Sequence, residues 1–507
     1  MEAILSRHGL PTQMGAGLPD AAALHAVLEE LLQALEAEAG RIAAGWGAPG
    51  PRAEFAPGAE NLAWYLALRR HDIRPLQRLL MVLGLSSLGR LESRVRPALQ
   101  AVRATLAGLA GLPPAPRPAA EDFFAGERAL ARHTAEVLGP ATPQRPVGLL
   151  VTCPSEAADD PGFMLQLARR GVEAVRLNCA HDDAAAWGRM IRHRDAAAEA
   201  TGHRMRVLMD LAGPKIRTGA LRLPGPGQRV MPESLLAVVP PGGLGEAPEG
   251  PTTFAAECTL PEVLEMVAPG DRLFVDDGKI ETVVERKAAW GLLARVTRVP
   301  EDGAKLRSEK GLNFPDTTIR CAALSEKDRE DLAFVARHAD GIEYSFVQSA
   351  EDIRLLQAAL AEHRPEDWRT LSLVLKIETT RAVRALPEML VQAAGQQPTA
   401  IMIARGDLAV EIGFARTAEM QEEILWLGEA AHVPVIWATQ VLEHLVRKGT
   451  PLRGEMTDAA MAARAECIML NKGPHLLLAI AELDGLLRRM GQHQYKKTPQ
   501  LRALTSW

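Results

Sequence analysis

The sequence predicts an α/β protein built on a (β/α)8 TIM barrel, with a β-rich domain inserted into the barrel and a helical region before it. Three observations lead to this fold class: purely helical periodicity at the start, a regular alternation of short apolar runs and amphipathic stretches from Val147 onward, and one long interruption rich in glycine and proline. With 507 residues and 47% hydrophobic side chains, the chain is long enough for several domains.

Residues 1 to about 140 carry only helical periodicity. The stretch AAALHAVLEELLQALEAEAGRIAAGW places apolar side chains three and four positions apart, which is the spacing of one helix face. The segment LGPATPQRP then breaks the pattern, as expected at a domain boundary. We predict an all-helical N-terminal extension over residues 1–143. Its first 140 residues contain 14 arginines and 14 acidic residues, so it lacks the net positive charge expected of a nucleic-acid-binding domain.

From Val147 onward the pattern is that of βα units around a parallel sheet, and eight such units are the number that closes a barrel. The eight runs are VGLLV at 147, VEAVRL at 172, MRVLMD at 205, GIEYSF at 341, LSLVLK at 371, AIMIAR at 400, VPVIWA at 433 and ECIML at 466. The interruption between the third and fourth runs contains an Asp277-Gly278 hairpin signal. We predict a β-barrel-like lid over residues 220–319, inserted into a catalytic barrel formed by residues 144–219 and 320–507.

Polar residues follow strand after strand of the predicted barrel, at the carboxyl ends where barrel enzymes carry their chemistry. They are Arg176 and Asn178 after the second run, Asp210, Lys215 and Arg217 after the third, Lys376 and Glu378 after the fifth, Arg405 and Asp407 after the sixth, and Thr439 after the seventh. One such residue is usually part of a surface ion pair, but five strand ends together indicate a site. Two carboxylates can hold Mg²⁺, and the surrounding cations indicate a polyanionic substrate.

The motifs in this part of the chain resemble those of the pyruvate kinase family. AVRLNCAH, MDLAGPKIRTG, VDDG, EKGLNFP, ALSEKDREDL, SFVQSAEDI, LKIE, MIARGDLAVEI and WATQVLEHL follow one another in the family's order and spacing, over roughly residues 147–475. The resemblance implies a glycolytic enzyme that transfers a phosphoryl group from phosphoenolpyruvate to ADP and releases pyruvate and ATP. It also implies a lid closing over a cleft where phosphoenolpyruvate, ADP and metal meet.

Roles for individual residues follow from the same resemblance. Glu378 and Asp407 would bind the catalytic Mg²⁺ or Mn²⁺. The side chains expected to act on the phosphoryl group and the enolate are Lys376, Arg176, Arg217 and Thr439, the last lying near the carbon that receives the proton. Contacts to substrate or nucleotide are expected from Asn178, His181, Asp277, Lys215, Arg405 and Gly406. Without a side chain, Gly406 would let the backbone approach the substrate carboxylate.

The sequence departs from the family's pattern at the nucleotide end. Thr152-Cys153-Pro154-Ser155 is shorter than the family's Thr-Ile-Gly-Pro-Ala-Ser, Gln348 stands where the family has Arg, and Asn471-Lys472-Gly473 replaces Ser-Gly-Glu. Two alternatives therefore stay open. One is a metal-dependent phosphoenolpyruvate or pyruvate aldolase or lyase, and the other is a non-catalytic or regulatory protein that keeps the fold.

The resemblance further implies that K⁺ is not required. The family's potassium-dependent branch has Glu in GPEIR and a Thr after the strand-three Asp, whereas this chain has Lys215 and Leu211. Leu211 and Ala180 offer no hydroxyl where that branch has Thr and Ser, so two hard oxygen ligands are missing. The ammonium of Lys215 can supply the same single positive charge.

Composition bounds the partners. The formal charge of −5 provides no excess of positive charge for binding nucleic acid. We find neither a signal-peptide pattern nor a run of 18 uninterrupted apolar residues, so the sequence does not predict a membrane protein. The five cysteines contain no CxxC pair, which argues against a zinc site or a disulfide scaffold. We expect a cytoplasmic homo-oligomer that uses phosphoenolpyruvate and ADP. Only one helix and a short tail are expected after the eighth run, which leaves no room for the family's C-terminal regulatory domain.

Overall fold

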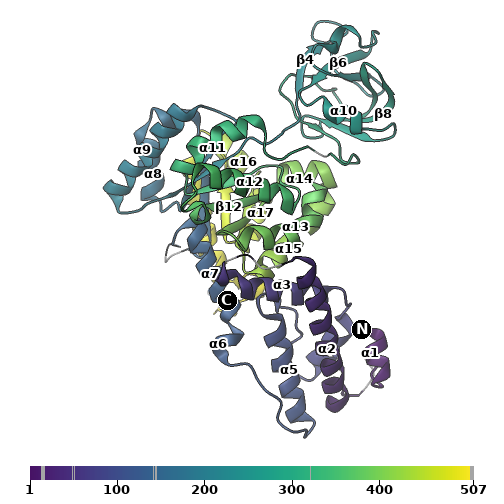
Figure 1. Cartoon of the computed structure of the whole chain (residues 1–507), viewed down its shortest axis with the longest axis vertical. Helices are drawn as coiled ribbons and strands as arrows, with labels where there is room; N and C mark the ends of the chain where they lie inside the picture. The colour runs from purple at the N-terminus through teal and green to yellow at the C-terminus, as the bar shows by residue number, and fades with distance from the viewer. Residues whose placement is uncertain are drawn as a thin grey trace.

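The computed structural model describes residues 1–12, 17–47, 50, 52–140, 142, 145–319 and 321–502. They form a helical body, a barrel and a β-domain, which follow one another along the long axis of the molecule (Figure 1). The helical body and the β-domain lie at opposite ends, with the barrel between them. No described helix is both long and apolar enough to cross a lipid bilayer.

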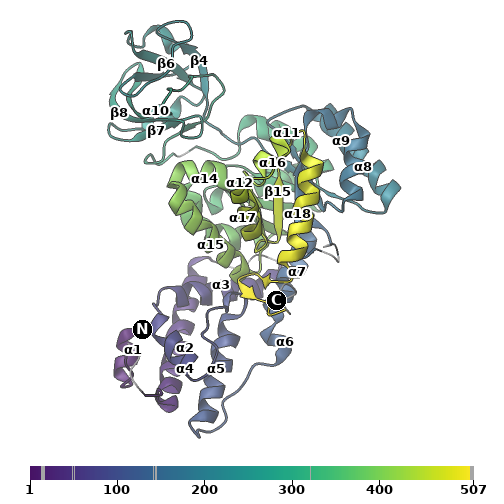
Figure 2. The same ribbon diagram turned by 180° about the vertical axis from the view of Figure 1, so that it is seen from behind.

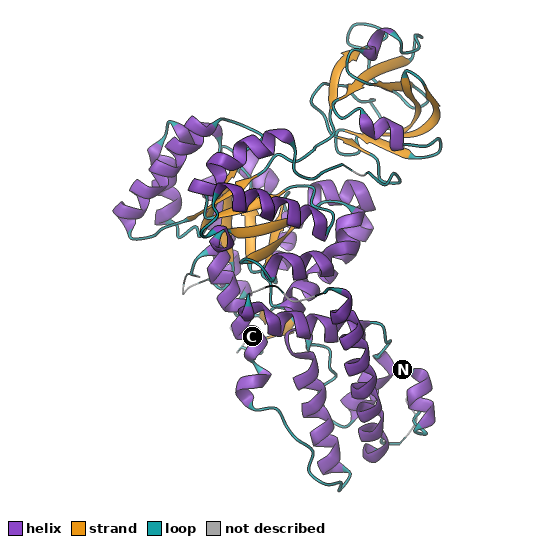
Figure 3. Ribbon diagram, viewed as in Figure 1, coloured by secondary structure: helices purple, strands orange, loops and turns teal. Residues whose placement is uncertain are grey.

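Eight parallel strands close into the barrel, in the order β1-β15-β14-β13-β12-β11-β3-β2 (Figure 3). This confirms the predicted fold class, and each strand overlaps one of the eight predicted runs. The strands are β1 (Gly148–Thr152), β2 (Ala174–Asn178), β3 (Arg206–Asp210), β11 (Gly341–Tyr344), β12 (Ser372–Ile377), β13 (Thr399–Ala404), β14 (Val435–Ala438) and β15 (Cys467–Leu470). Nearly all of their side chains are buried, as expected for a parallel sheet covered by helices.

Helices connect successive strands and form the outer layer of the barrel. They are η3 (Ser155–Ala158), α8 (Pro161–Arg169), α9 (Ala184–Thr201), α11 (Glu326–His338), α12 (Ala350–His363), η5 (Trp368–Thr370), α13 (Thr380–Ala394), α14 (Arg405–Ile412), α15 (Phe414–Ala431), α16 (Glu443–Lys448), α17 (Arg453–Ala462) and α18 (Leu476–Met490). Their starts follow local capping chemistry. In α11, for example, the Ser325 side chain accepts from the Asp328 amide while the Asp328 carboxylate accepts from the Ser325 amide.

The inserted domain is a seven-stranded sheet with an apolar core of its own. Its elements are β4 (Thr218–Arg222), β5 (Leu235–Val239), η4 (Gly243–Gly245), β6 (Thr253–Cys258), α10 (Glu262–Met266), β7 (Arg272–Val275), β8 (Ile280–Ala288), β9 (Gly291–Arg298) and β10 (Leu312–Asn313). The predicted hairpin joins β7 to β8, and Asp276, Asp277 and Gly278 in its turn all have positive φ. Because this core is separate, the domain can change its position over the barrel without unfolding.

The N-terminal body consists of helices, as predicted. They are α1 (Glu2–Arg7), α2 (Ala21–Gly45), η1 (Ala53–Phe55), α3 (Ala56–Arg69), α4 (Arg74–Val82), η2 (Glu92–Arg94), α5 (Val95–Leu109), α6 (Ala120–Phe123) and α7 (Ala125–Leu138). α3 packs closely on α15 of the barrel, since a Cβ on Gly58 would lie 2.3 Å from the carbonyl oxygen of Ala431. A residue with a side chain at position 58 would push the two helices apart.

Helix α7 closes the amino end of the barrel. Its last residues, Val137 and Leu138, belong to the same apolar cluster as inward-facing strand residues such as Leu150 and Met402. His133 Nδ1 lies 2.7 Å from the carbonyl oxygen of His432, which fixes the helix to the end of α15. The end of the predicted extension is thus part of the barrel core.

The tail after α18 adds an element that the sequence did not predict, a two-stranded hairpin of β16 (Gln494–Tyr495) and β17 (Thr498–Pro499). It lies between the barrel and the helical body (Figure 2). Lys496 forms an ion pair with Glu466 at the base of the barrel, and Lys497 forms one with Glu92 of the helical body. The hairpin therefore bridges the two bodies.

Candidate active site

Arg176 joins the carboxyl ends of three strands. Its Nε donates to Glu343 Oε2 at 3.0 Å and its Nη1 to Thr152 Oγ1 at 3.1 Å, while Nη2 contacts the Asp210 carboxylate. Burial alone would raise the pKa of Asp210, but the charges of Arg176 and Lys376 outweigh it and hold that pKa below its ordinary value. The guanidinium is thus fixed in the barrel mouth, with further N–H groups left for a ligand.

Lys376 lies at the centre of the site. Its Nζ donates to Ser345 Oγ at 2.6 Å and to Asp210 Oδ1 at 3.0 Å, and it lies 3.3 Å from Glu378 Oε1. Burial disfavours the charged amine, but the carboxylates of Asp210 and Glu378 outweigh that effect and raise the pKa of Lys376 above its ordinary value. A buried lysine therefore stays positively charged here.

Glu378 and Asp407 are the two carboxylates predicted to bind metal. Glu378 Oε2 accepts the Phe346 amide at 2.6 Å, and Asp407 Oδ1 accepts from Lys215 Nζ at 2.8 Å. Burial raises the pKa of Glu378, and the like charge of Asp407 adds to the effect although Lys376 opposes it. A cation bound between the two carboxylates would relieve the repulsion that Asp407 exerts on Glu378.

This donor set fits Mg²⁺ better than a metal held by protein ligands alone. No group of three or more His, Cys, Asp or Glu side chains that could hold a metal occurs in the part of the chain that the structure describes. Mg²⁺ commonly takes one or two carboxylates and completes its shell with substrate oxygens and water. Glu378 and Asp407 match that requirement.

Thr439 and Gly406 meet at the ends of β14 and β13. The Gly406 amide donates to Thr439 Oγ1 at 2.8 Å, which leaves the hydroxyl hydrogen free to point elsewhere. Thr439 has a φ of 63°, an uncommon conformation for a β-branched residue. A Cβ on Gly406 would make only an ordinary contact of 3.7 Å with Thr439 Oγ1, so the protein itself does not demand glycine at this position.

Arg405 differs from our expectation of a direct substrate contact. Its Nε donates to Ala438 O at 3.0 Å, its Nη2 donates to Thr439 O at 2.6 Å, and both terminal nitrogens pair with Asp458. The guanidinium, stacked over the Trp437 ring, is thus committed to acceptors within the protein. Arg405 thus contacts the backbone at Thr439, because a cation at a strand end can serve the backbone as well as a ligand, and its predicted contact with substrate stays a prediction.

Four further predicted residues lie outside the Arg176–Lys376 cluster. Arg217 lies at the lid base, the segments that join the inserted domain to the barrel, where its Nη1 donates to Glu309 O at 3.1 Å. Asp277 is exposed in the hairpin between β7 and β8 of the lid. Asn178 Oδ1 accepts the Ala180 amide at 3.0 Å, and the His181 side chain is exposed. In this conformation, no contact recorded for the described residues joins any of the four to Lys376 or Glu378. The roles expected for these four residues stay predictions.

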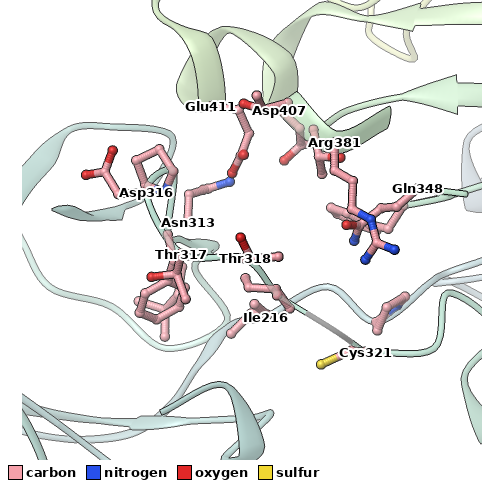
Figure 4. Close-up of a pocket in the computed structure, with 18 of the residues that line it drawn as sticks. Ile216, Asn313, Asp316, Thr317, Thr318, Cys321, Gln348, Arg381, Asp407 and Glu411 are labelled. Atoms are coloured by element: carbon pink, nitrogen blue, oxygen red, sulfur yellow. The ribbon is translucent and has the colours of Figure 1, made fainter. Parts of the chain in front are cut away.

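A cavity of about 440 Å³ lies beside the two carboxylates, between the lid base and helices α13 and α14. Lys215 and Phe346 line the cavity. Asp407, Glu411, Arg381 and Gln348 also line it (Figure 4). Burial raises the pKa of Glu411 to about 7, although Asn313 of the lid donates to its carboxylate. The size is within the range of small-molecule sites.

Sequence reasoning missed several residues of this network. Glu343, Ser345 and Asp458 each contact a predicted site residue. The signal for Glu343 was a charged residue inside the apolar run GIEYSF, where an inward-facing position is expected to be apolar. Asp458 gave no such signal, because it lies on a helix that is distant in sequence from Arg405.

Comparison with known proteins assigns the family. The family model described as "Pyruvate kinase, barrel domain" matches residues 138–473. A pyruvate kinase of Corynebacterium efficiens is 32% identical over 340 residues, which are 64% of this chain and 67% of that protein. The pyruvate kinase of Geobacillus stearothermophilus is 31% identical over 312 residues, 60% of this chain and 49% of that protein.

Human pyruvate kinase PKLR is 32% identical over 318 residues, 60% of this chain and 52% of that protein. The matched part thus covers about half to two thirds of the length of these relatives. Because the family model covers more than half of the chain, and because the barrel places Lys376, Glu378 and Asp407 in one mouth, the chain belongs to the pyruvate kinase family.

Proposed function

We propose that this protein catalyses the transfer of the phosphoryl group of phosphoenolpyruvate to ADP, giving pyruvate and ATP, with Mg²⁺ or Mn²⁺ bound by Glu378 and Asp407. One observation supports this most directly: Lys376 stays charged although it is buried, and it lies 3.3 Å from a proposed metal ligand. A buried cation beside a metal site is what a reaction needs when negative charge develops on an enolate oxygen.

The reaction breaks the bond between phosphorus and the enol oxygen of phosphoenolpyruvate and forms one between phosphorus and a β-phosphate oxygen of ADP. Arg176 holds the phosphoryl group through its remaining N–H donors, and Lys376 stabilises the charge that develops on the enol oxygen. When bound, the divalent cation neutralises charge on the phosphoryl group. A proton then adds to the methylene carbon of enolpyruvate, near the Thr439 hydroxyl, to give pyruvate.

The same proposal includes independence of K⁺. The Lys215 ammonium lies 2.8 Å from Asp407 Oδ1 and over the Phe346 ring. A fixed positive charge therefore stands beside the proposed metal ligands, where it would repel a second cation. In tetramethylammonium buffer of constant ionic strength, we expect added KCl to change activity by less than about twofold; a stimulation of about tenfold would contradict the assignment.

A coupled assay tests the function. The purified chain, supplied with phosphoenolpyruvate, ADP and Mg²⁺, is expected to form pyruvate, and EDTA is expected to stop it. A panel of nucleoside diphosphates would identify the acceptor, since the altered Thr152–Ser155 segment lies at the nucleotide end. No pyruvate with any nucleotide would contradict the proposal. Formation of pyruvate without a nucleotide would mean that water accepts the phosphoryl group, and would instead indicate a phosphatase. Homo-oligomerisation stays a prediction, which light scattering can check.

A further inference from the structure

Glu343 is a buried carboxylate inside the barrel that the mechanism above does not use. It lies on β11 and has no exposed surface. Its Oε2 accepts from Arg176 Nε at 3.0 Å, but its Oε1 has no hydrogen-bond partner among the described residues. A buried carboxylate oxygen without a protein partner is costly, because burial removes it from bulk water. The residue therefore needs an explanation beyond packing.

Each element that packs against Glu343 brings a titratable or charged group. They are Arg176 on β2, Asp210 on β3, Lys376 on β12 and Cys467 on β15. Burial raises the pKa of Glu343 to about 7, and the neighbouring charge of Asp210 adds to this, while Arg176 and Lys376 oppose it. The pKa of Asp210 in the same cluster is lowered. Glu343 is thus the carboxyl of the pair that takes up a proton near neutral pH.

The charges in the barrel mouth indicate that a proton on Glu343 would favour the binding of an anion. Three cations, Arg176, Lys376 and Lys215, face four carboxylates, those of Asp210, Glu343, Glu378 and Asp407. When all of these groups are ionised, their net charge is negative. This is unfavourable for binding the phosphate dianion that the proposed substrate carries. In particular, Arg176 already holds two carboxylates. A proton on Glu343 would neutralise one of these carboxylates. The Arg176 guanidinium would then be freer to bind the ligand.

We propose that Glu343 is a proton-linked positioning residue for Arg176: when a phosphate dianion binds in the barrel mouth, Glu343 takes up a proton from solvent on its free oxygen, Oε1, and releases the charge of Arg176 to the ligand. The identity of that ligand, phosphoenolpyruvate, rests on the proposed function. No bond other than the new O–H bond is made or broken in this step, and no oxidant or reductant takes part.

The first test uses the unmodified protein. Phosphoenolpyruvate is titrated into the Mg²⁺-loaded chain without ADP, by calorimetry at about pH 8 in two buffers of different ionisation enthalpy, so that proton uptake is measured directly. The substrate phosphate is already a dianion at that pH. We expect an uptake approaching one proton per ligand, and KM for phosphoenolpyruvate rising up to about tenfold per pH unit above the Glu343 pKa. Binding without proton uptake would overturn the inference.

The second test compares two conservative variants. Glu343→Gln keeps the shape and removes the titration, so it is expected to abolish the uptake and to flatten the pH profile of KM. The matched control is Glu173→Gln, which alters another buried glutamate paired with an arginine, Arg145, at the other end of the barrel. This control is expected to keep both the uptake and the profile of the unmodified protein.

Two outcomes in the variant would contradict the proton linkage: an unchanged uptake, or an affinity weakened equally at every pH, which a purely structural role would produce. If Glu343→Gln does not fold, the measurement on the unmodified protein still decides. The two proposals fail separately. Proton uptake on binding without any pyruvate formation with ADP would refute the proposed function alone, and pyruvate formation without linked uptake would refute the role of Glu343 alone.

Discussion

The two ends of the barrel each contain a buried arginine–glutamate pair, and the pairs differ in how completely their groups are satisfied. At the amino end, Arg145 Nη2 contacts both oxygens of Glu173 at 2.6 and 2.7 Å, and Glu173 Oε2 also accepts the Leu149 amide at 2.7 Å. At the carboxyl end, Glu343 keeps one oxygen without a partner, beside Asp210 and Lys376.

This difference distinguishes an ion pair that stabilises the fold from one that is placed to act on a ligand. In the Arg145–Glu173 pair both carboxylate oxygens are bound and α7 covers that end of the barrel with apolar residues, so we call this pair closed, although Arg145 Nε has no hydrogen-bond partner among the described residues. The Arg176–Glu343 pair is open, because Glu343 Oε1 has no partner among the described residues and Arg176 keeps further N–H donors for a ligand. Unbalanced charge costs stability, and it is retained where a charged ligand can balance it.

The largest expected effect is on turnover, after a change at the carboxyl end of the barrel. Lys376→Ala removes the cation placed where the enolate forms, so we expect turnover to fall by about 10²-fold or more while the chain stays folded. Circular dichroism and the pyruvate assay measure the two properties on one sample. A variant that turns over phosphoenolpyruvate like the unmodified protein would show that the site is wrongly assigned.

The proposed metal ligands give the next effect. Asp407→Asn removes a formal charge facing the ion, so the Mg²⁺ concentration for half-maximal activity is expected to rise about tenfold or more, and Glu378→Gln is expected to act in the same direction. The measurement is a Mg²⁺ titration of activity at saturating phosphoenolpyruvate. Asp316→Asn, in the nearby lid, is the matched control and should leave the titration unchanged. Equal shifts in all three variants would argue against the assignment.

Changes to the Arg145–Glu173 pair at the amino end are expected to affect the stability of the protein. Arg145→Met leaves Glu173 buried without its cation, and such a loss typically costs about 3–5 kcal/mol, so a clear drop in melting temperature is expected. The double change Arg145→Met with Glu173→Met should recover much of that loss, because no unpaired charge remains. Activity of the folded fraction is expected to be normal. A stable single variant would show that this pair is not closed in solution.

The smallest expected effect concerns the tail hairpin. Burial raises the pKa of Glu429 to about 7, with Glu92 and Glu466 contributing and Lys496 opposing. Since this pKa is raised on folding, the residue's contribution to stability is present at low pH and declines as pH rises through about 7.

Glu429→Gln should therefore reduce the loss of thermal stability between about pH 6 and 8, by about 2–4 °C. Glu423→Gln, on the same helix, serves as the control. An identical loss in the Glu429 variant and the unmodified protein would remove Glu429 as the cause.

The sequence by itself determined the barrel and the positions where its chemistry lies. Apolar runs and turn residues are local signals, and the carboxyl end of each strand follows from its direction along the chain. For this reason the eight strands and the helical N-terminal body were predictable. Lys376, Glu378 and Asp407 could be located in the same way, because each lies at the end of such a run or within two residues after it.

Only the tertiary structure decided which partners these residues have. Arg405 pairs with Asp458, Lys215 with Asp407, and Lys497 with Glu92, across separations of 53, 192 and 405 positions in the chain. No local pattern encodes such contacts, because they arise when distant helices and strands pack together. Burial is also a tertiary property. It sets the pKa of Glu343 to about 7, and the sequence marked that residue only as a charge in an apolar run.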